Sequence, residues 1–392
     1  MLAKRPLIRR TATLAALGGA AAISVRLLSR PLPGAERQLI DWEGVRRAAR
    51  ARSGERSPLQ PERAARLGAR YDTFAAEMVP LLAEVCGAPP AGIPRFTVLD
   101  RHGFIDANVL MVRRLIEPVE RLRTALPETG LTAFGRGLST RYVGEVLGFM
   151  SQRALGQYDP VLMLPAPALG TGPAGAAEGG TRPAGSLYLV EPNVELLQRG
   201  QGAPADPLRR WLILHEATHA WQFESHPWLG PHIGGLMNEL LGAGLGEGAA
   251  QGHGSEVLRR LASGVSGQLR GVGRLQAVMS VLEGYSNLVM HRVGRAHIDD
   301  FEELEAAFAR RQEQRSLLER LILGFTGISL KLRQYELGER FAEALIAEGG
   351  YALLNRVWEG PEMMPGMAEL REPARWIVRA RRQGRTRARR AD

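Results

Sequence analysis

Apolar residues recur at three- and four-residue intervals along most of this chain, and this is the spacing of one face of an α-helix. Leu110, Val112, Leu115 and Val119 are one example. The pattern predicts helices over residues 40–52, 61–86, 106–126, 134–156, 207–224, 273–293, 301–324, 330–347 and 350–358.

Strand patterns are few. Val161–Leu164 and Leu187–Val190 are short apolar runs, and a connection rich in Pro, Gly and Ala separates them over residues 165–186. They predict a β-hairpin with a long connection, and Pro192 should end its second strand. The glycine-rich residues 230–275 predict short helices and loops. The expected fold class is therefore mainly α with a small β-hairpin or sheet.

Neither an internal repeat nor a linker is visible, so the pattern favours one compact domain over residues 38–380. Residues 1–37 would form a basic and apolar extension before it. Residues 381–392 would form a disordered, arginine-rich tail after it.

The net charge of +10 resides in the two ends of the 392-residue chain. Residues 1–33 hold six Lys or Arg and no acid, and residues 375–392 hold eight Arg and one Asp, so the body between them is slightly acidic. A folded nucleic-acid binder would carry a basic face on its body, so no specific nucleic-acid partner is expected. Weak contact of the basic ends with a membrane or another polyanion stays open.

The N-terminus has the outline of a signal peptide. Basic residues precede the apolar stretch Thr11–Val25, which is short for a transmembrane helix. It suits the apolar part of a signal, but no clear cleavage site follows. We expect a cytoplasmic protein, with export or membrane anchoring through residues 1–30 as the alternative.

A single cysteine, Cys86, excludes an intramolecular disulfide and a cysteine-rich zinc site. It lies in a predicted helix, where a buried structural role is expected.

The most specific motif is His215-Glu216-Ala217-Thr218-His219. Two histidines four residues apart share one face of a helix, so both can bind one Zn²⁺. Glu216 between them can take a proton from metal-activated water. The alternative is an amphipathic helix that happens to carry two histidines. However, apolar neighbours predict a buried helix, in which these polar side chains would be costly without a ligand.

That helix has a predicted start at Asp206-Pro207, as an N-cap followed by proline at the first helical position.

A catalytic zinc ion takes three protein ligands, and the third must come from elsewhere in the chain. The apolar helix predicted over 273–293 offers Glu283, which is the favoured candidate. A surface salt bridge is the alternative role for Glu283. The rival ligands are His226, His232, His253, His291 and His297, or no third protein ligand.

Taken together, several motifs resemble the zincin-like group of zinc-dependent metalloproteases that is common in actinobacteria and often labelled as associated with biosynthesis of a deazaflavin coenzyme. The resemblance covers roughly residues 38–380, and its motifs are Ile40-Asp41-Trp42, Phe149–Pro160, Val190–Asn193, His215–Glu224, Pro227–Leu229, Leu282–Gly284, Lys331–Phe341 and Asn355–Trp358. It implies a mainly helical zincin-like fold with zinc on His215, His219 and Glu283 and the base at Glu216.

The chain departs from this family next to the third ligand. Members usually read Glu-Gly-His-Ala-Asp where this chain has Glu283-Gly-Tyr285-Ser-Asn287. The aspartate would accept a hydrogen bond from a ligand histidine, and the carbonyl oxygen of Asn287 can do so without charge. Losing such a partner weakens metal affinity or activity by about 10–100-fold, so a weakened member is one possibility.

Lys331–Gly338 is a further candidate for site chemistry. Arg333 or Tyr335 could stabilise an oxyanion or hold a substrate carboxylate. The alternative is an ion-paired structural helix that includes Glu336, Glu339 and Arg340.

These observations favour a zinc-dependent hydrolase that cleaves a peptide or protein substrate, with Leu187–Val190 lying beside the extended substrate. One alternative is a catalytically weakened zinc-binding scaffold. The other is a protein that binds a membrane surface or a polyanion through its basic ends.

Overall fold

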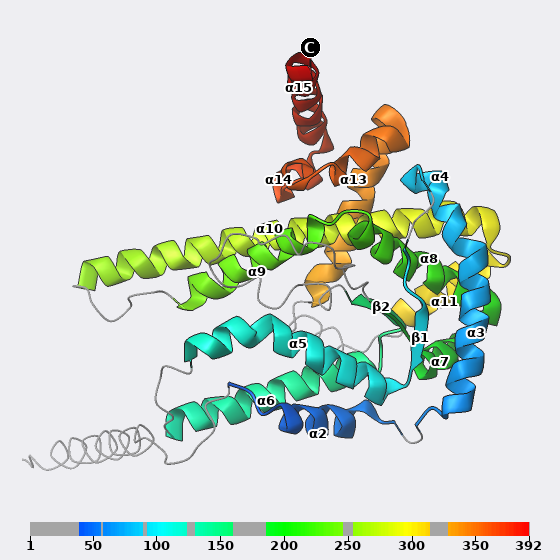
Figure 1. Ribbon diagram of the computed structural model, residues 1–392, viewed down its shortest axis with the longest axis horizontal. Coiled ribbons are helices and arrows are strands. Elements are labelled where there is room, and N and C mark those ends of the chain that lie inside the picture. The colour runs from blue at the N-terminus through cyan, green and yellow to red at the C-terminus, as the bar shows by residue number, and fades with distance from the viewer. Residues whose placement is uncertain are drawn as a thin grey trace, which may run out of the picture. The chain divides into compact units, whose positions relative to one another are not determined.

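The computed structural model describes residues 39–55, 58–88, 92–123, 130–159, 186–245, 254–313 and 328–391, and these are mainly helical with one small sheet (Figure 1). The chain divides into two compact units. The first combines Met1–Arg56 with Ile105–Gln152, and the second combines Ser57–Phe104 with Arg153–Asp392. We expected one compact domain, and the sequence carries no linker that marks this division.

The first unit packs α2 (Trp42–Ser53) against α6 (Gly130–Ser151), together with most of α5 (Arg101–Arg123). α2 begins where the side chain of Asp41 accepts a hydrogen bond from the backbone N–H of Gly44, 2.9 Å away. Two glycines of α6 let the helices approach closely. A Cβ on Gly144 would lie 2.6 Å from the Cβ of Ala48, and one on Gly148 equally close to that of Arg52.

The second unit holds the remaining helices and the sheet. Its helices are α3 (Pro61–Met78), η1 (Val79–Leu82), α4 (Ala83–Cys86), α7 (Glu191–Gln201), α8 (Ala205–Glu224), α9 (Leu229–Leu245), α10 (Gly254–His297), α11 (Phe301–Glu313), α13 (Ile328–Asn355), η3 (Arg356–Trp358), η4 (Pro361–Met363), α14 (Met367–Arg371) and α15 (Pro373–Ala391).

The sheet has the strand order β1-β3-β2, with β1 (Phe96–Leu99) parallel and β2 (Gly156–Asp159) antiparallel to the central β3 (Ser186–Val190). Leu187 of β3 is opposite Phe96 on one side and Tyr158 on the other. The predicted hairpin paired Leu187–Val190 with Val161–Leu164, which falls outside the described residues. In the structure, Leu187–Val190 pairs antiparallel with the earlier segment Gly156–Asp159. The expectation that Leu187–Val190 pairs with an extended substrate through its backbone is wrong, because β1 and β2 already pair with both edges of β3.

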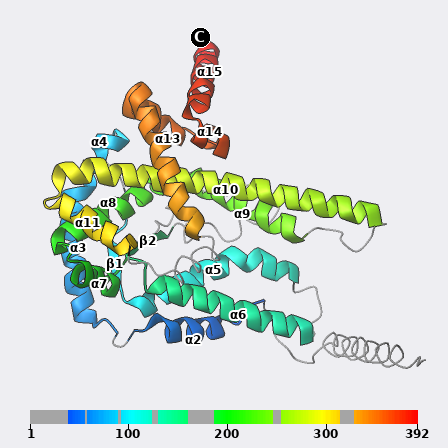
Figure 2. The same ribbon diagram turned by 180° about the vertical axis from the view of Figure 1, so that it is seen from behind.

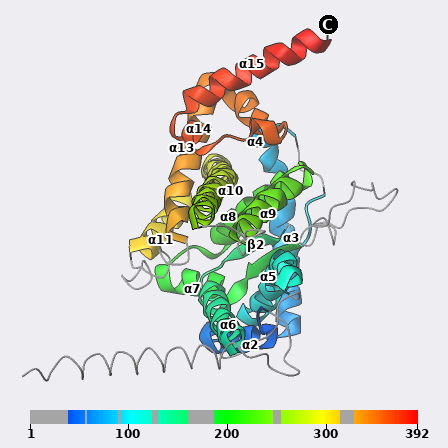
Figure 3. The ribbon, with the colours of Figure 1, turned by 90° about the vertical axis from the view of Figure 1, so that its left-hand side faces the viewer.

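The 44-residue α10 runs through the second unit, and α13 crosses it steeply (Figures 1 and 2). Figure 3, which looks along α10, shows α13 on one side of it and α9 on the other. The expectation of short helices and loops over 230–275 is therefore wrong, because α9 and α10 cover most of that range and pack on each other. Contacts between the two helices outweigh the low helix propensity of their glycines.

The C-terminal residues differ from expectation as well. α15 is helical to Ala391, where a disordered tail was expected from residue 381. The indole N–H of the buried Trp376 donates to the carbonyl of Met363 at 2.7 Å, and Arg379 Nε lies 2.6 Å from Glu369 Oε1. These contacts hold the first half of α15 on the preceding turns. Contact of the basic ends with a polyanion stays a prediction, and residues 1–37 lie outside the described residues.

Among the described residues, no helix has both the length and the apolar composition needed to cross a membrane.

Candidate metal centre

The His-Glu-x-x-His motif lies in the middle of α8, a helix that is buried along most of its length. α8 begins at Ala205 with Pro204 as its N-cap. The predicted start is thus wrong by two residues, and Asp206 lies in the first turn, where its charge favours the positive helix end. Helical spacing places His215 and His219 one turn apart on one face, as predicted.

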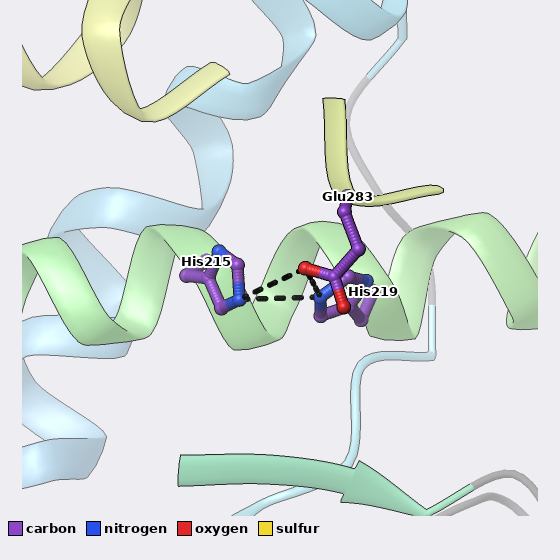
Figure 4. A group of neighbouring side chains, drawn as sticks. All are labelled: His215, His219 and Glu283. Carbon is purple, nitrogen blue, oxygen red and sulfur yellow. Dashed lines mark hydrogen bonds and ion pairs between the residues drawn. The ribbon is translucent and has the colours of Figure 1, made fainter. Parts of the chain in front are cut away.

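Three ligand atoms converge at this face (Figure 4). Nε2 of His215 and Nε2 of His219 lie 3.2 Å apart. Glu283 reaches them from α10, with Oε2 at 3.9 Å from His215 Nε2 and 3.8 Å from His219 Nε2. Glu283 is far from the motif in the sequence, and the packing of α10 on α8 brings it next to the two histidines. Among the described residues, these three form the only group with the spacing of metal ligands.

These separations fit a tetrahedral zinc ion. Ligand atoms about 2.0–2.1 Å from zinc lie about 3.3–3.4 Å apart in that geometry, so the observed triangle needs only small side-chain shifts. Two imidazoles and one carboxylate are also a donor set that zinc accepts in catalytic sites. The residues therefore fit the metal that the motif predicts.

Glu216 is buried beside this triangle, with 4% of its surface exposed. Burial, together with repulsion from the Glu283 carboxylate, raises its pKa to about 8, although the backbone N–H of Tyr158 donates to it and opposes the shift. Among the described residues, no arginine or lysine contributes to this pKa shift. A metal cation would neutralise the charge of these two neighbouring carboxylates.

The strand β2 lies directly over Glu216, a contact that the sequence did not indicate. A Cβ on Gly156 would lie 2.6 Å from Glu216 Oε1, so only glycine fits there without displacing the carboxylate. The phenol of Tyr158, two residues later, donates to Glu224 Oε1 at 2.9 Å and holds β2 against the end of α8. Residue 156 was expected to end a helix, because a four-residue strand with two polar residues carries little periodic pattern.

The partners of His219 differ from those expected. Its Nδ1 lies 3.0 Å from Gln222 Oε1 and 3.3 Å from Ser286 Oγ. Asn287 was expected to accept this hydrogen bond, but the partners of His219 Nδ1 among the described residues are Gln222 and Ser286. The sequence spacing could have indicated Gln222, which is three residues after His219 on the same helix face.

Tyr285 is a core residue rather than a neighbour of the ligands. Its ring stacks on that of Trp221, with centroids 5.4 Å apart. Its hydroxyl donates to Asn355 Oδ1 at 2.7 Å and contacts Cys86 Sγ at 3.7 Å. Burial raises the pKa of the Tyr285 phenol and raises that of the Cys86 thiol to about 12, which agrees with the structural role expected for Cys86.

The rival histidines have other partners. Nδ1 of His226 donates to the carbonyl of Gln222 at 2.9 Å, and burial lowers its pKa. His291 Nδ1 lies 2.7 Å from Glu339 Oε1, and His297 Nε2 lies 2.7 Å from Glu84 Oε1. His232 packs against the ring of Trp228. His253 lies outside the described residues.

Arg333 and Tyr335 belong to α13, but their side chains lie outside the described residues, so their role stays a prediction. Farther along α13, Arg340 and Glu336 form an exposed pair with 3.8 Å between Nη2 and Oε2.

Two histidines of one helix, a glutamate of a second helix and a buried glutamate between the histidines form a candidate metal centre with the residue pattern His-Glu-x-x-His. In comparison with protein-family models, residues 40–377 match the zincin-like metallopeptidase family. This chain belongs to that family.

Among solved structures, the chain is similar to a "putative hydrolase with a novel fold" from Chloroflexus aurantiacus. The two share 33% sequence identity with a TM-score of 0.64, and the match covers 88% of this chain and 99% of the other. A search of curated proteins finds no match. Neither match carries the actinobacterial or deazaflavin label of the resemblance, so both labels stay predictions.

Proposed function

We propose that this protein is a zinc-dependent hydrolase, a metallopeptidase that cleaves a peptide or amide bond. The observation that carries the proposal is the convergence of His215, His219 and Glu283 beside the buried carboxylate of Glu216. Three protein ligands leave the fourth position of a tetrahedral zinc ion open, which is typical of catalytic sites and not of structural ones. Membership of the zincin-like family supports the same function.

When bound, zinc would polarise the scissile carbonyl and lower the pKa of the attacking water towards about 7. Glu216 would take the proton of that water and pass it to the leaving nitrogen. The charge of a bound zinc ion would favour the ionised form of Glu216, which is the form that can act as a base. Its burial keeps bulk water from competing for the proton.

The metal ligands are tested by zinc content and by competition with a chelator, using the full-length protein. We expect one equivalent of zinc in the wild type. Glu283→Ala should bind zinc more than about 100-fold more weakly, because losing a ligand costs more than losing the hydrogen-bond partner of a ligand. His291→Gln is the matched control on the same helix and should bind zinc as the wild type does. Equal affinity in Glu283→Ala and wild type would exclude Glu283 as a ligand.

The hydrolase activity is tested with a mixed peptide library and mass spectrometry of the products. Glu216→Gln should lower cleavage by about 10²–10⁴-fold, because it removes the general base, while stoichiometric zinc is retained. Full activity in this variant would overturn the role of Glu216. A zinc-loaded wild type that cleaves no peptide would instead favour the zinc-binding scaffold.

A further inference from the structure

We infer that Gln222 is a positioning residue of the metal centre: its side-chain amide fixes the tautomer of His219 and ties this ligand to the turn of α10 that carries Glu283. The inference rests on the proposed function only in that it takes His219 and Glu283 as metal ligands. Gln222 follows the motif on α8 and has no exposed surface.

The orientation of the Gln222 amide is determined by a neighbour that can only accept hydrogen bonds. Its Nε2 donates to the backbone carbonyl of Leu282 at 2.9 Å. The amide oxygen therefore faces His219, where it lies 3.0 Å from Nδ1. Because an amide oxygen can only accept, the hydrogen of this contact must be on His219 Nδ1. The other ring nitrogen, Nε2, is then left with its lone pair.

The lone pair of His219 Nε2 is directed to the metal position. This atom is the one that lies 3.2 Å from His215 Nε2 and 3.8 Å from Glu283 Oε2. Gln222 thus selects the one tautomer of neutral His219 that can bind zinc at this triangle.

The contacts of Ser286 agree with this assignment. Its hydroxyl donates to the carbonyl of Leu282 at 3.0 Å, so its oxygen is left to accept from His219 Nδ1 at 3.3 Å. Both partners of His219 are therefore anchored on one carbonyl, that of Leu282, which is the residue before Glu283. This arrangement couples the position of the ligand on α8 to that of the ligand on α10.

A neutral partner also suits the charge of the site. Glu216 and Glu283 already place two carboxylates side by side, and their charges repel each other. A third carboxylate against His219 would add to this repulsion, whereas the Gln222 amide orients the ring without charge.

The first test needs no substitution. In the metal-free, full-length protein labelled with ¹⁵N-histidine, NMR at a pH well above the ordinary histidine pKa of about 6.5 reports which ring nitrogen carries the hydrogen. The His219 signal, assigned by its loss in His219→Gln, should show the Nδ1–H tautomer. The Nε2–H tautomer would overturn the inference. Because this measurement requires neither zinc nor activity, it is independent of the proposed function.

The second test compares zinc affinities. Gln222→Met keeps the length of the side chain but removes both hydrogen bonds, and should weaken zinc binding about 10–100-fold and shift His219 away from a single tautomer. Ser280→Ala is the control, because it also removes a buried hydrogen bond of α10, from Ser280 Oγ to the carbonyl of Gln276, without contacting His219. Wild-type affinity together with an unchanged tautomer in Gln222→Met would overturn the inference, whether or not the protein cleaves peptides.

Discussion

Gly284 of α10 and Gly338 of α13 bring the backbones of these two helices into direct contact. A Cβ on Gly338 would overlap the carbonyl oxygen of Ser280, and one on Gly284 would overlap the backbone of Gly338. Gly284 follows Glu283, the proposed third ligand. The close crossing therefore holds the turn of α10 that presents Glu283 to α8.

Gly338→Ala should destabilise the protein by at least about 1–3 kcal/mol, because the added methyl forces the two helices apart. It should also weaken zinc binding, since the turn that carries Glu283 would shift. Thermal or denaturant unfolding and a chelator competition would measure both effects. Gly68→Ala on α3, where a Cβ would meet nothing within 4 Å, is the control and should be neutral or stabilising. Equal stability of Gly338→Ala and wild type would contradict the close crossing.

Gly156→Ala should lower hydrolysis without loss of zinc. The new Cβ would lie 2.6 Å from Glu216 Oε1 and would displace the proposed base, whereas the three ligand atoms belong to other elements. We expect a loss within the range of about 10²–10⁴-fold that general bases contribute. Gly200→Ala on α7, which has open space around it, should leave the rate unchanged. An unaltered rate in Gly156→Ala would show that β2 does not position Glu216.

Arg209→Met should be among the most destabilising substitutions outside the metal centre. Arg209 pairs with Glu191 through Nη2, Tyr71 donates to the other carboxylate oxygen of Glu191 at 2.7 Å, and all three side chains are buried. Removing the guanidinium leaves the charge of Glu191 buried without its cation, at a cost of about 3–5 kcal/mol.

The next residue provides the control for this prediction. Arg210 pairs with Glu77 at 2.9 Å near the surface, where solvent screens the charges, so Arg210→Met should cost no more than about 1 kcal/mol. Urea unfolding of the two variants measures the contrast. Similar losses of stability would mean that burial of the Arg209 pair has no special effect.

The pair between His291 of α10 and Glu339 of α13 should make stability depend on pH. The hydrogen bond that His291 donates to the Glu339 carboxylate raises the pKa of His291 above its ordinary value. The protonated pair stabilises the fold fully below the unfolded pKa of about 6.5, and this contribution is lost as pH rises through the higher folded pKa. Melting temperatures of wild type and His291→Gln across this range should converge at high pH. A difference in melting temperature that stays constant with pH would contradict a stabilising role of the His291–Glu339 pair.

Many of the helices follow from local sequence patterns, and the elements that these patterns failed to predict were missed for identifiable reasons. The helices around Trp42, Tyr71 and His215 were predicted because their apolar residues recur at helical spacing. α7 was missed because Pro192 reads as the end of a strand, although proline is also favoured in the first turn of a helix. β1 was missed because its four residues are too few to show a period.

The sequence by itself determined that His215 and His219 share one face of α8, because residues four apart on a helix must share a face whatever the rest of the chain does. It also made Glu283 the favoured third ligand. Only the tertiary structure decided that Glu283 meets the histidines, that Gln222 and not Asn287 holds His219, and that β2 covers Glu216. The contacts of Glu283 with the histidines, of β2 with Glu216 and of the Gln222 amide with Leu282 join residues about 60 positions apart in different elements, so they depend on how these elements pack. Gln222 and His219 are three residues apart on α8, and the packing of α10 on α8 orients the Gln222 amide toward His219.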